Sequence, residues 1–294
     1  MIITSTKYMV EITLVKLIAG ADGFFNYPSG ICLHRESNLF YIADMHNQRI
    51  CWLSEDGRAG VLSNVVASNG SRTSLCRPLA VWITNQGILF TADAEHNKIF
   101  YKTQQADVWK SILVDSKFPF NLPGGVTVDE RGNVYTNDFL NNRLVQIDPN
   151  GKVTILLDSE GNINKPYGIF YQDNKLYYTD TGNARICYID LVSGQVNALM
   201  PQIETKGFSF PIAITLDDEG NIYICEQRSM YFLDIEKNIL SLIIDKDIWK
   251  AQMKKHSIPD RICHMGALTV RRKGEVYWVD TIKGYIYRMI LDFP

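Results

Sequence analysis

One pattern recurs six times along this chain of 294 residues, and it constrains the fold more than any other feature. Each copy has a small residue, an alternating apolar stretch and then an acid 12 to 14 residues after the small residue. Successive acids lie about 47 residues apart on average, which is the length of a four-stranded propeller blade. The small residues are Gly30, Ala80, Gly125, Gly168, Ala213 and Gly266, and the acids are Asp44, Asp93, Asp138, Asp180, Glu226 and Asp280.

Within each copy, the local pattern predicts short antiparallel strands. Period-two runs rich in β-branched and aromatic residues are typical of strands, and turn residues such as those at 131–133 and 219–221 separate them. A third strand opens after the acid, as at Arg49 and Arg143, and an outer strand follows, as at 153–157. The predicted fold class is therefore all-β, a six-bladed β-propeller of four-stranded antiparallel blades in a single domain, 1–294.

The last copy supplies only three strands, near 267–271, 275–280 and 285–290. We expect residues 11–19 to supply the outer strand of this last blade, so that the N-terminal strand joins the C-terminal blade and closes the ring. Charged residues interrupt every apolar run of the first twenty residues. We therefore predict neither an export signal nor a membrane anchor there.

The charge balance bears on the partners of the chain. The 30 basic residues nearly equal the 32 acidic ones, so the net charge of −2 gives no general attraction to nucleic acid or to an anionic membrane. The six cysteines lie at least 19 residues apart and show no metal-ligand spacing. We expect free thiols in a cytoplasmic monomer, without a cofactor and without a nucleic-acid or membrane partner.

The repeat resembles the NHL-repeat family of β-propellers over almost the whole chain. The motif D-x-x-N-x-R-[IL], as it stands from Asp44, is the most diagnostic part of this resemblance, whereas Tyr231 and Tyr285 replace the basic residue in the last two copies. Similar gluconolactonase-like enzymes bind a divalent metal through acidic or amide side chains where the inner strands begin. The residues there are Ser29, Leu79, Gly124, Tyr167, Ile212 and Met265, so we predict no metal site.

A ligand site is expected on the face where the inner strands begin, because the acids and the connections between blades lie there too. The acids themselves are expected to be architectural, since every copy has one. Departures from the repeat are more informative. His264 occupies the place of the proline and is either a base or metal ligand or a hydrogen-bonded strand start. Glu226 and Arg228 alter the usual acid turn, and with His264 and Tyr167 they are the candidate catalytic residues.

The connection 245–263 is long for a compact repeat, and we expect it to form a lid-like insertion with a helix at about Ile248–His256. The candidate ligand-binding residues come from this insertion, from the mouth of the channel and from neighbouring turns. They are Ser29, His46, His96, Arg261, Met265 and Trp249.

Two functions remain open from the sequence, since propellers bind, scaffold and catalyse on the same frame. The first is an NHL-like propeller that binds a small-molecule or protein partner on the face with the inter-blade loops and the channel mouth. The alternative is a metal-independent lyase, isomerase or cyclase with its active site at the same mouth. A pocket in which His264 and Arg228 converge would favour the enzyme.

Overall fold

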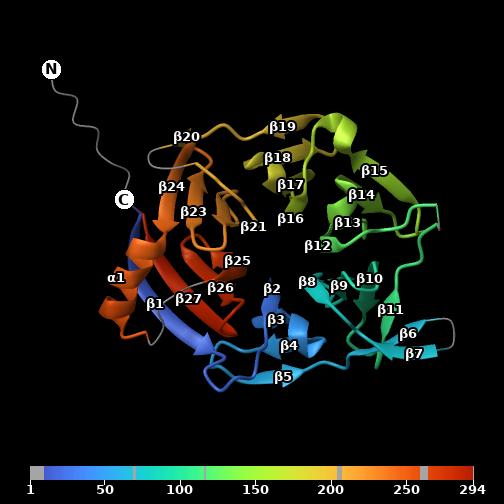
Figure 1. The fold of residues 1–294 in the computed structure, drawn as a ribbon, viewed down its shortest axis with the longest axis horizontal. Helices are drawn as coiled ribbons and strands as arrows, with labels where there is room; N and C mark the ends of the chain where they lie inside the picture. Colours follow the sequence, from blue (N-terminus) through green and yellow to red (C-terminus); the bar gives the residue numbers. More distant parts are fainter. Residues whose placement is uncertain (1–9, 69–70, 116, 204–206, 259–263, 294) are drawn as a thin grey trace.

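A computed structural model describes residues 10–68, 71–115, 117–203, 207–258 and 264–293. Six sheets surround a central axis, with the first strand of each sheet nearest to that axis (Figure 1). Each inner strand contacts the inner strand of the next blade, and the last contacts the first. The predicted six-bladed propeller is therefore confirmed. Blades are numbered here in chain order.

The strands of the first three blades are given from the axis outward. Blade one has β2 (Pro28–His34), β3 (Leu39–Asp44), β4 (Arg49–Leu53) and β5 (Ala59–Val61). Blade two has β8 (Pro78–Ile83), β9 (Leu89–Asp93), β10 (Lys98–Lys102) and β11 (Trp109–Ser111), followed outward by β6 (Val65–Ser68) and β7 (Ser71–Ser74). Blade three has β12 (Pro123–Val128), β13 (Val134–Asp138), β14 (Arg143–Ile147) and β15 (Val153–Leu157).

The other three blades follow the same plan. Blade four has β16 (Pro166–Gln172), β17 (Lys175–Asp180), β18 (Arg185–Asp190) and β19 (Val196–Ala198). Blade five has β21 (Ala213–Leu216), β22 (Ile222–Cys225), β23 (Met230–Asp234) and β24 (Ile239–Ile244), followed outward by β20 (Gln202–Ile203). Blade six has β25 (Met265–Arg272), β26 (Glu275–Asp280), β27 (Tyr285–Asp292) and β1 (Glu11–Ala19).

The ring closes in blade six, as the sequence predicts. Strand β1 pairs antiparallel with β27, with Glu11 opposite Asp292 and Leu17 opposite Tyr287. Blades two and five differ from the expected four strands, because β6 and β7 extend the former and β20 the latter. Strand β6 joins β11 in parallel, and β20 joins β24 in parallel, an arrangement that the repeat does not predict.

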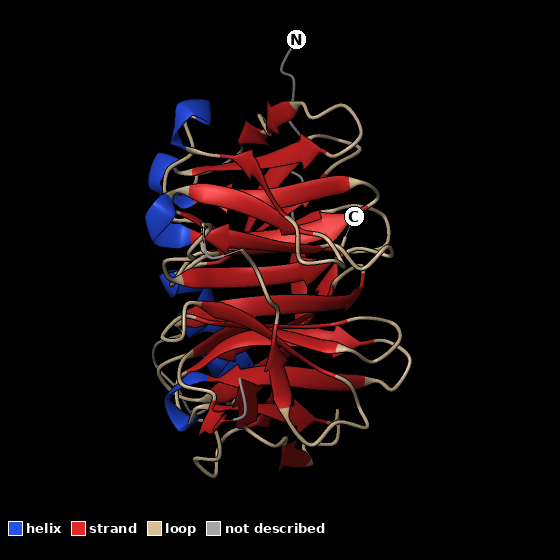
Figure 2. Cartoon of the chain, turned by 90° about the vertical axis from the view of Figure 1, so that its right-hand side faces the viewer, coloured by secondary structure: helices blue, strands red, loops and turns tan. Residues whose placement is uncertain are grey.

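The two faces of the disc are built differently. On one face, called the turn face here, the second strands end at the acids and the blades connect to one another. Helical segments gather on this face (Figure 2): the helix α1 (Lys246–His256) and the 3₁₀ turns η1 (Met45–Asn47), η2 (Phe139–Asn141), η3 (Ser159–Gly161) and η4 (Thr181–Asn183). The opposite face carries the hairpins that join the first strand to the second and the third to the fourth. It is called the hairpin face.

The helix predicted in the long connection is present and starts two residues earlier than expected. The Asp245 carboxylate accepts hydrogen bonds from the backbone N–H groups of Asp247 and Ile248, at 3.0 and 2.8 Å, which caps the helix. Trp249 is 2% exposed and lies against Trp278, with 5.8 Å between ring centroids. Helix α1 therefore packs on the outer part of the disc, against β1 and β24. In the described part of the chain, no helix combines the length and the apolar character that a membrane span needs.

Candidate functional site

The repeated acids tie each inner strand to its own blade. Asp44 accepts a hydrogen bond from the backbone N–H of Asn26 at 2.7 Å, and Asp138 accepts one from Asn121 at 2.6 Å. In both blades the arginine five residues later also binds the acid, with 2.7 Å between Nε and Oδ2. Both acids are fully buried. These contacts support the expectation that the acids are architectural, since a buried carboxylate needs such partners.

Glu226 makes the contacts of a scaffold acid. One oxygen accepts hydrogen bonds from the backbone N–H groups of Ser209 and Phe210, the latter at 2.8 Å. His96 Nδ1 lies 3.2 Å from Asp93 Oδ2, where other blades place an asparagine, but it makes no described hydrogen bond. The roles of Glu226 in catalysis and of His96 in ligand binding stay predictions, and the carboxylate of Glu226 already has backbone partners.

The strand register of blade six corrects one step of the sequence comparison. Met265 lies opposite Asp280, as Pro28 lies opposite Asp44 in blade one. Met265 therefore takes the place of the proline, and His264 corresponds to the residue before it. An irregularity follows the first pair in both strands, so counting from Gly266 misplaced the alignment by one residue. Met265 is 1% exposed and belongs to the core between blades five and six.

With this register, two sets of side chains surround the channel mouth on the turn face. The first set directly precedes the proline of each copy, or Met265 in blade six, and the second occupies the second position after each acid. The first consists of Tyr27, Arg77, Leu122, Lys165, Phe210 and His264, and the second of His46, Glu95, Leu140, Gly182, Arg228 and Ile282. Tyr27 and His46 stack, with 4.4 Å between ring centroids and 22° between ring planes. The mouth therefore combines aromatic, apolar and cationic groups with the carboxylate of Glu95.

Tyr167 is the predicted catalytic residue that reaches this mouth. Burial raises the pKa of its phenol, the positive charge of Arg77 opposes that shift, and Tyr27 adds to it. These effects come from blades two and one, although Tyr167 belongs to blade four, so the three side chains approach one another across the mouth. The phenol therefore stays protonated at neutral pH, where it can donate its proton and can also accept a hydrogen bond.

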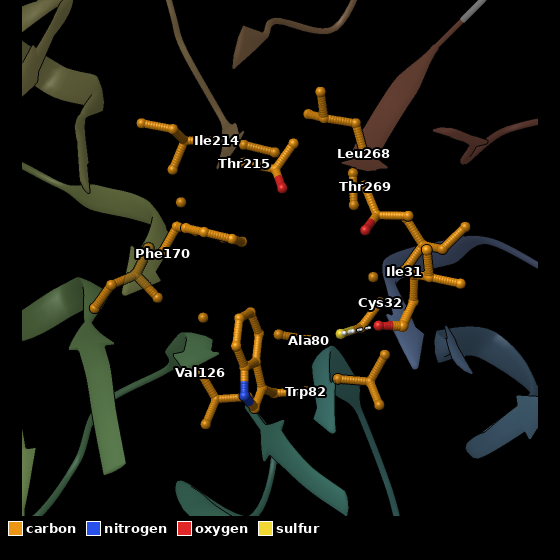
Figure 3. A pocket seen from close by; sticks show the side chains of 18 of the residues that line it. Ile31, Cys32, Ala80, Trp82, Val126, Phe170, Ile214, Thr215, Leu268 and Thr269 are labelled. Carbon is orange, nitrogen blue, oxygen red and sulfur yellow. Dashed lines mark hydrogen bonds between the residues drawn. The ribbon is translucent and has the colours of Figure 1, made fainter. Parts of the chain in front are cut away.

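An axial cavity of about 210 Å³ lies between the six inner strands (Figure 3). The same position recurs in all six inner strands, and at this position the paired residue of the second strand is always a tyrosine or a phenylalanine. These six positions lie at one level of the channel. The residues at that level are Cys32, Trp82, Thr127, Phe170, Thr215 and Thr269. Trp82 and Phe170 pack edge to face, with 5.4 Å between ring centroids, and form an aromatic wall. Small polar side chains from blades five, six and one form the opposite wall.

Two threonine hydroxyls point into the cavity without a partner in the described part of the chain. Thr215 is 3% exposed and Thr269 is 8% exposed, and both line the cavity (Figure 3). Thr127 differs, because its hydroxyl accepts a hydrogen bond from the backbone N–H of Tyr171 at 3.2 Å. Burial raises the pKa of the Cys32 thiol to about 11, so this neighbour is also protonated. The wall therefore offers neutral hydrogen-bonding groups that the described structure does not use.

The other end of the cavity lies under the hairpin face. Arg35 lines it and forms an ion pair with Asp218, with 2.6 Å between Nη1 and Oδ1. Because these residues belong to blades one and five, the pair spans blade six at the rim of the channel. His34 is fixed beside it, with its Nδ1 2.7 Å from the hydroxyl of Ser37.

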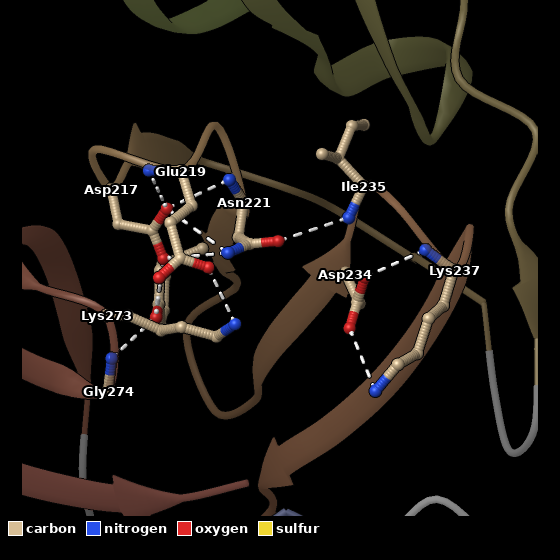
Figure 4. Close-up of polar contacts among 9 residues, drawn as sticks. Asp217, Glu219, Asn221, Asp234, Ile235, Lys237, Lys273 and Gly274 are labelled. Carbon is tan, nitrogen blue, oxygen red and sulfur yellow. Dashed lines mark hydrogen bonds and ion pairs between the residues drawn. The ribbon is translucent and has the colours of Figure 1, made fainter.

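Hydrogen bonds and ion pairs also connect the hairpins of blades five and six (Figure 4). Asp217 accepts from the backbone N–H groups of Glu219 and Asn221, both at 3.0 Å. Gly274 of blade six donates its N–H to the Tyr223 hydroxyl at 2.8 Å, and Lys273 pairs with Glu219 at 2.8 Å. The hairpin face is thus held together across blades.

The structure separates the remaining candidates. Ser29 lines the cavity, and its hydroxyl donates to the Pro78 carbonyl at 3.1 Å. Trp249, a residue of α1, is buried in the core, and none of the described residues of the insertion lines the cavity. Arg228 is exposed on the turn face, and no described contact joins it to His264. Arg261 lies outside the described residues.

Among the described residues, no group of three or more histidine, cysteine, aspartate or glutamate side chains is placed to hold a metal ion. Sequence reasoning missed Thr215, Thr269 and Trp82 as cavity residues and Arg77 and Tyr27 at the mouth. Comparing the axial position of each copy would have revealed aromatic residues in one half of the ring and small polar ones in the other.

The NHL repeat model matches residues 25–53. A comparison with curated proteins finds no match. A gluconolactonase from Xanthomonas campestris is similar in structure, with a TM-score of 0.68, 13% identity, and coverage of 91% of this chain and 87% of that chain. An inactive virginiamycin B lyase from Staphylococcus aureus, with quinupristin, has a TM-score of 0.65, 14% identity, and coverage of 97% and 100%. A chain of a nidogen/laminin complex has a TM-score of 0.61, 18% identity, and coverage of 74% and 79%. At these identities the likeness shows the fold alone.

Proposed function

We propose that this NHL-repeat propeller binds a small molecule in its axial cavity, which the ligand enters from the turn face. The observation that carries the proposal is the pair of hydroxyls of Thr215 and Thr269, which face the cavity opposite an aromatic wall and make no described hydrogen bond within the protein. A hydrogen bond between such a group and a ligand contributes about 0.5–1.5 kcal/mol.

The cavity limits the size and chemistry of the ligand. Apolar cavities of about 150 Å³ bind benzene-sized molecules, so about 210 Å³ suits one ring with a short substituent. The ring would pack against Trp82 and Phe170, which prefer edge-to-face or offset contacts. A polar atom of the ligand would bond to a threonine hydroxyl, which both donates and accepts.

The two ends of the channel favour different routes of entry. At the hairpin face, the ion pair between Arg35 and Asp218 spans the rim. At the turn face, Tyr27 and Arg77 are exposed, and no described partner holds the Arg77 guanidinium. Entry from the turn face therefore requires no ion pair to break.

The test uses phenylacetamide as a neutral one-ring probe, with binding followed by saturation-transfer NMR. Thr269→Leu fills the cavity and should abolish the signal, whereas Thr154→Leu, on the exposed outer strand of blade three, should leave it unchanged. Thr269→Val keeps the shape and should weaken binding about tenfold by removing one hydrogen bond. A native protein that gives no signal, or a signal that Thr269→Leu does not change, would overturn the proposal.

The alternative function, a metal-independent lyase, isomerase or cyclase at the same mouth, draws support from Tyr167. A protonated phenol near Arg77 is suited to give a proton to a leaving group or an oxyanion. The solved structures that resemble this chain include a named lyase, although that likeness concerns the fold. The enzyme would be established if the native protein converts a bound molecule into a product and Tyr167→Phe binds the same molecule equally well without converting it. Molecules that stay bound and unchanged would favour binding alone.

A further inference from the structure

The cations of the two faces differ in their partners. On the hairpin face, Arg35 pairs with Asp218, Arg272 with Glu275 and Lys273 with Glu219, all within 3 Å. Around the turn-face mouth, no described side chain pairs with the three exposed cations. These cations are Arg77, Lys165 and Arg228. The repeated acids of this face are buried, whereas Glu95 is exposed there.

The backbone holds Arg77 two residues before Leu79, which lines the cavity. Its N–H donates to Asp93 Oδ1 at 3.1 Å, and its carbonyl accepts from the N–H of Ala94 at 3.0 Å. Pro78 follows with a fixed φ, and Leu79 already lines the cavity. The Arg77 side chain therefore starts from a rigid point two residues outside the cavity lining.

Lys165 is held in a comparable way two blades further around the mouth. It precedes Pro166 and has a φ of +50°, a left-handed conformation that side-chain-bearing residues rarely adopt. Its N–H donates to Asn142 Oδ1 at 2.8 Å, which holds that conformation from the preceding blade. Tyr167, two residues further on, lines the cavity.

An apolar cavity beneath unpaired cations selects for one class of molecule. A ligand that carries an anionic group on a ring can bury the ring against Trp82 and Phe170 and leave its charge at the mouth. The planar guanidinium of an arginine binds carboxylate and phosphate oxygens in pairs, and its bonds to an anion are about twice as strong as neutral ones. Such a ligand would pair with the cations and fill the apolar cavity at the same time.

We propose that the ligand of the axial cavity is a small organic anion, a carboxylate or a phosphate monoester, whose charged group is bound by Arg77 with Lys165 beside it. This inference rests on the proposed binding of a small molecule in the cavity and specifies the chemistry of that molecule. Arg77 determines specificity for the anion and does not hold the ring.

The experiment compares phenylacetate with phenylacetamide, which share one shape and differ in charge, and adds phenyl phosphate to distinguish the two anions. Dissociation constants are measured by NMR titration of the native protein, of Arg77→Met and of Arg131→Met. Arg131 is an exposed arginine of the hairpin face and serves as the matched control. The tighter of the two anions identifies which group the mouth prefers.

The native protein should bind phenylacetate or phenyl phosphate about tenfold or more tightly than phenylacetamide, as expected for hydrogen bonds to a charged group. Arg77→Met should remove this preference and leave the amide affinity unchanged, and Arg131→Met should change neither. Equal affinity for all three probes in the native protein would overturn the anion inference and leave cavity binding standing. A preference that survives Arg77→Met would also overturn it. If none of the three probes binds, both the anion inference and the proposed binding function are overturned.

Discussion

The two faces of the disc use their charges in opposite ways. On the hairpin face, carboxylates and cations neutralise one another, as Glu275 does with Arg288 at 2.8 Å and Glu55 with Arg271 at 2.8 Å. On the turn face, the repeated acids bind backbone N–H groups and, as Asp44 does with Arg49, an arginine of their own blade, whereas Arg77 has no described side-chain partner. The charges of the hairpin face thus hold blades together, whereas on the turn face the guanidinium of Arg77 is available for a ligand.

The largest expected effect tests the structural side of this contrast. Glu275→Ala should lower the free energy of unfolding by about 3 kcal/mol, because it removes the 3% exposed carboxylate that Arg271 and Arg288 share and leaves them only the more exposed Glu55. Arg77→Met, on the turn face, should stay within about 0.5 kcal/mol of the native protein. Urea unfolding measures both. Similar losses in the two variants would contradict the division between the faces.

A second prediction separates scaffold from ligand site within the turn face. Glu226→Ala should lower the free energy of unfolding by about 2 kcal/mol, since the N–H groups of Ser209 and Phe210 lose their acceptor. Arg228→Ala, two residues later and exposed, should leave stability unchanged. If Glu226→Ala unfolds like the native protein, its carboxylate is free for chemistry and the catalytic prediction gains support.

The pH dependence of stability should come from the hairpin face. Burial alone would raise the pKa of Glu275, but the hydrogen bond from Tyr277 and the charges of Arg288 and Arg271 lower it below its usual 4.5. A lowered folded-state pKa gives stability that is present above the ordinary pKa and is lost as pH falls through the folded value. The stability difference between the native protein and Glu275→Gln should therefore shrink below about pH 4. A difference that stays constant down to pH 3 would exclude this linkage.

The smallest effect compares two buried threonines. Thr215→Val should raise the free energy of unfolding by up to about 1 kcal/mol, because its hydroxyl has no described partner. Thr136→Val should lower it by about 1 kcal/mol, because that hydroxyl donates to the Gly125 carbonyl at 2.7 Å. Thermal and urea unfolding give both signs. Equal destabilisation would mean that the Thr215 hydroxyl is already satisfied.

The fold could be predicted from the sequence because each of the six copies carries the same pattern of strands and turns. The closing strand 11–19 was predictable by counting, since blade six otherwise lacked one strand. The error at His264 arose from a register irregularity after Met265, which shifts pairing without changing the spacing between residue types. Strands β6, β7 and β20 are additions outside the repeat, so no copy could predict them.

The site was less predictable, because it depends on which blades face one another. Tyr167 and Ser29 were found from their place at the mouth, and both line the cavity. Trp249 was expected to serve a lid, but its indole is buried against Trp278, and sequence spacing cannot tell a lid from a packed helix. Thr215 and Thr269 form a wall only after the ring places blades five and six next to each other.

The pairing of β1 with β27 has a consequence for the order of events during synthesis. Thr13 donates its hydroxyl to the Ile290 carbonyl, a contact between residues 277 positions apart. A ribosome releases the chain from its N-terminus, so β1 must wait for nearly every other strand before it finds its partner. Five blades can form as they emerge, but the sixth cannot be completed before β27 has been synthesised. The axial cavity, which needs all six walls, then comes into being in a single late step, and a nascent chain has no ligand site to occupy before that step.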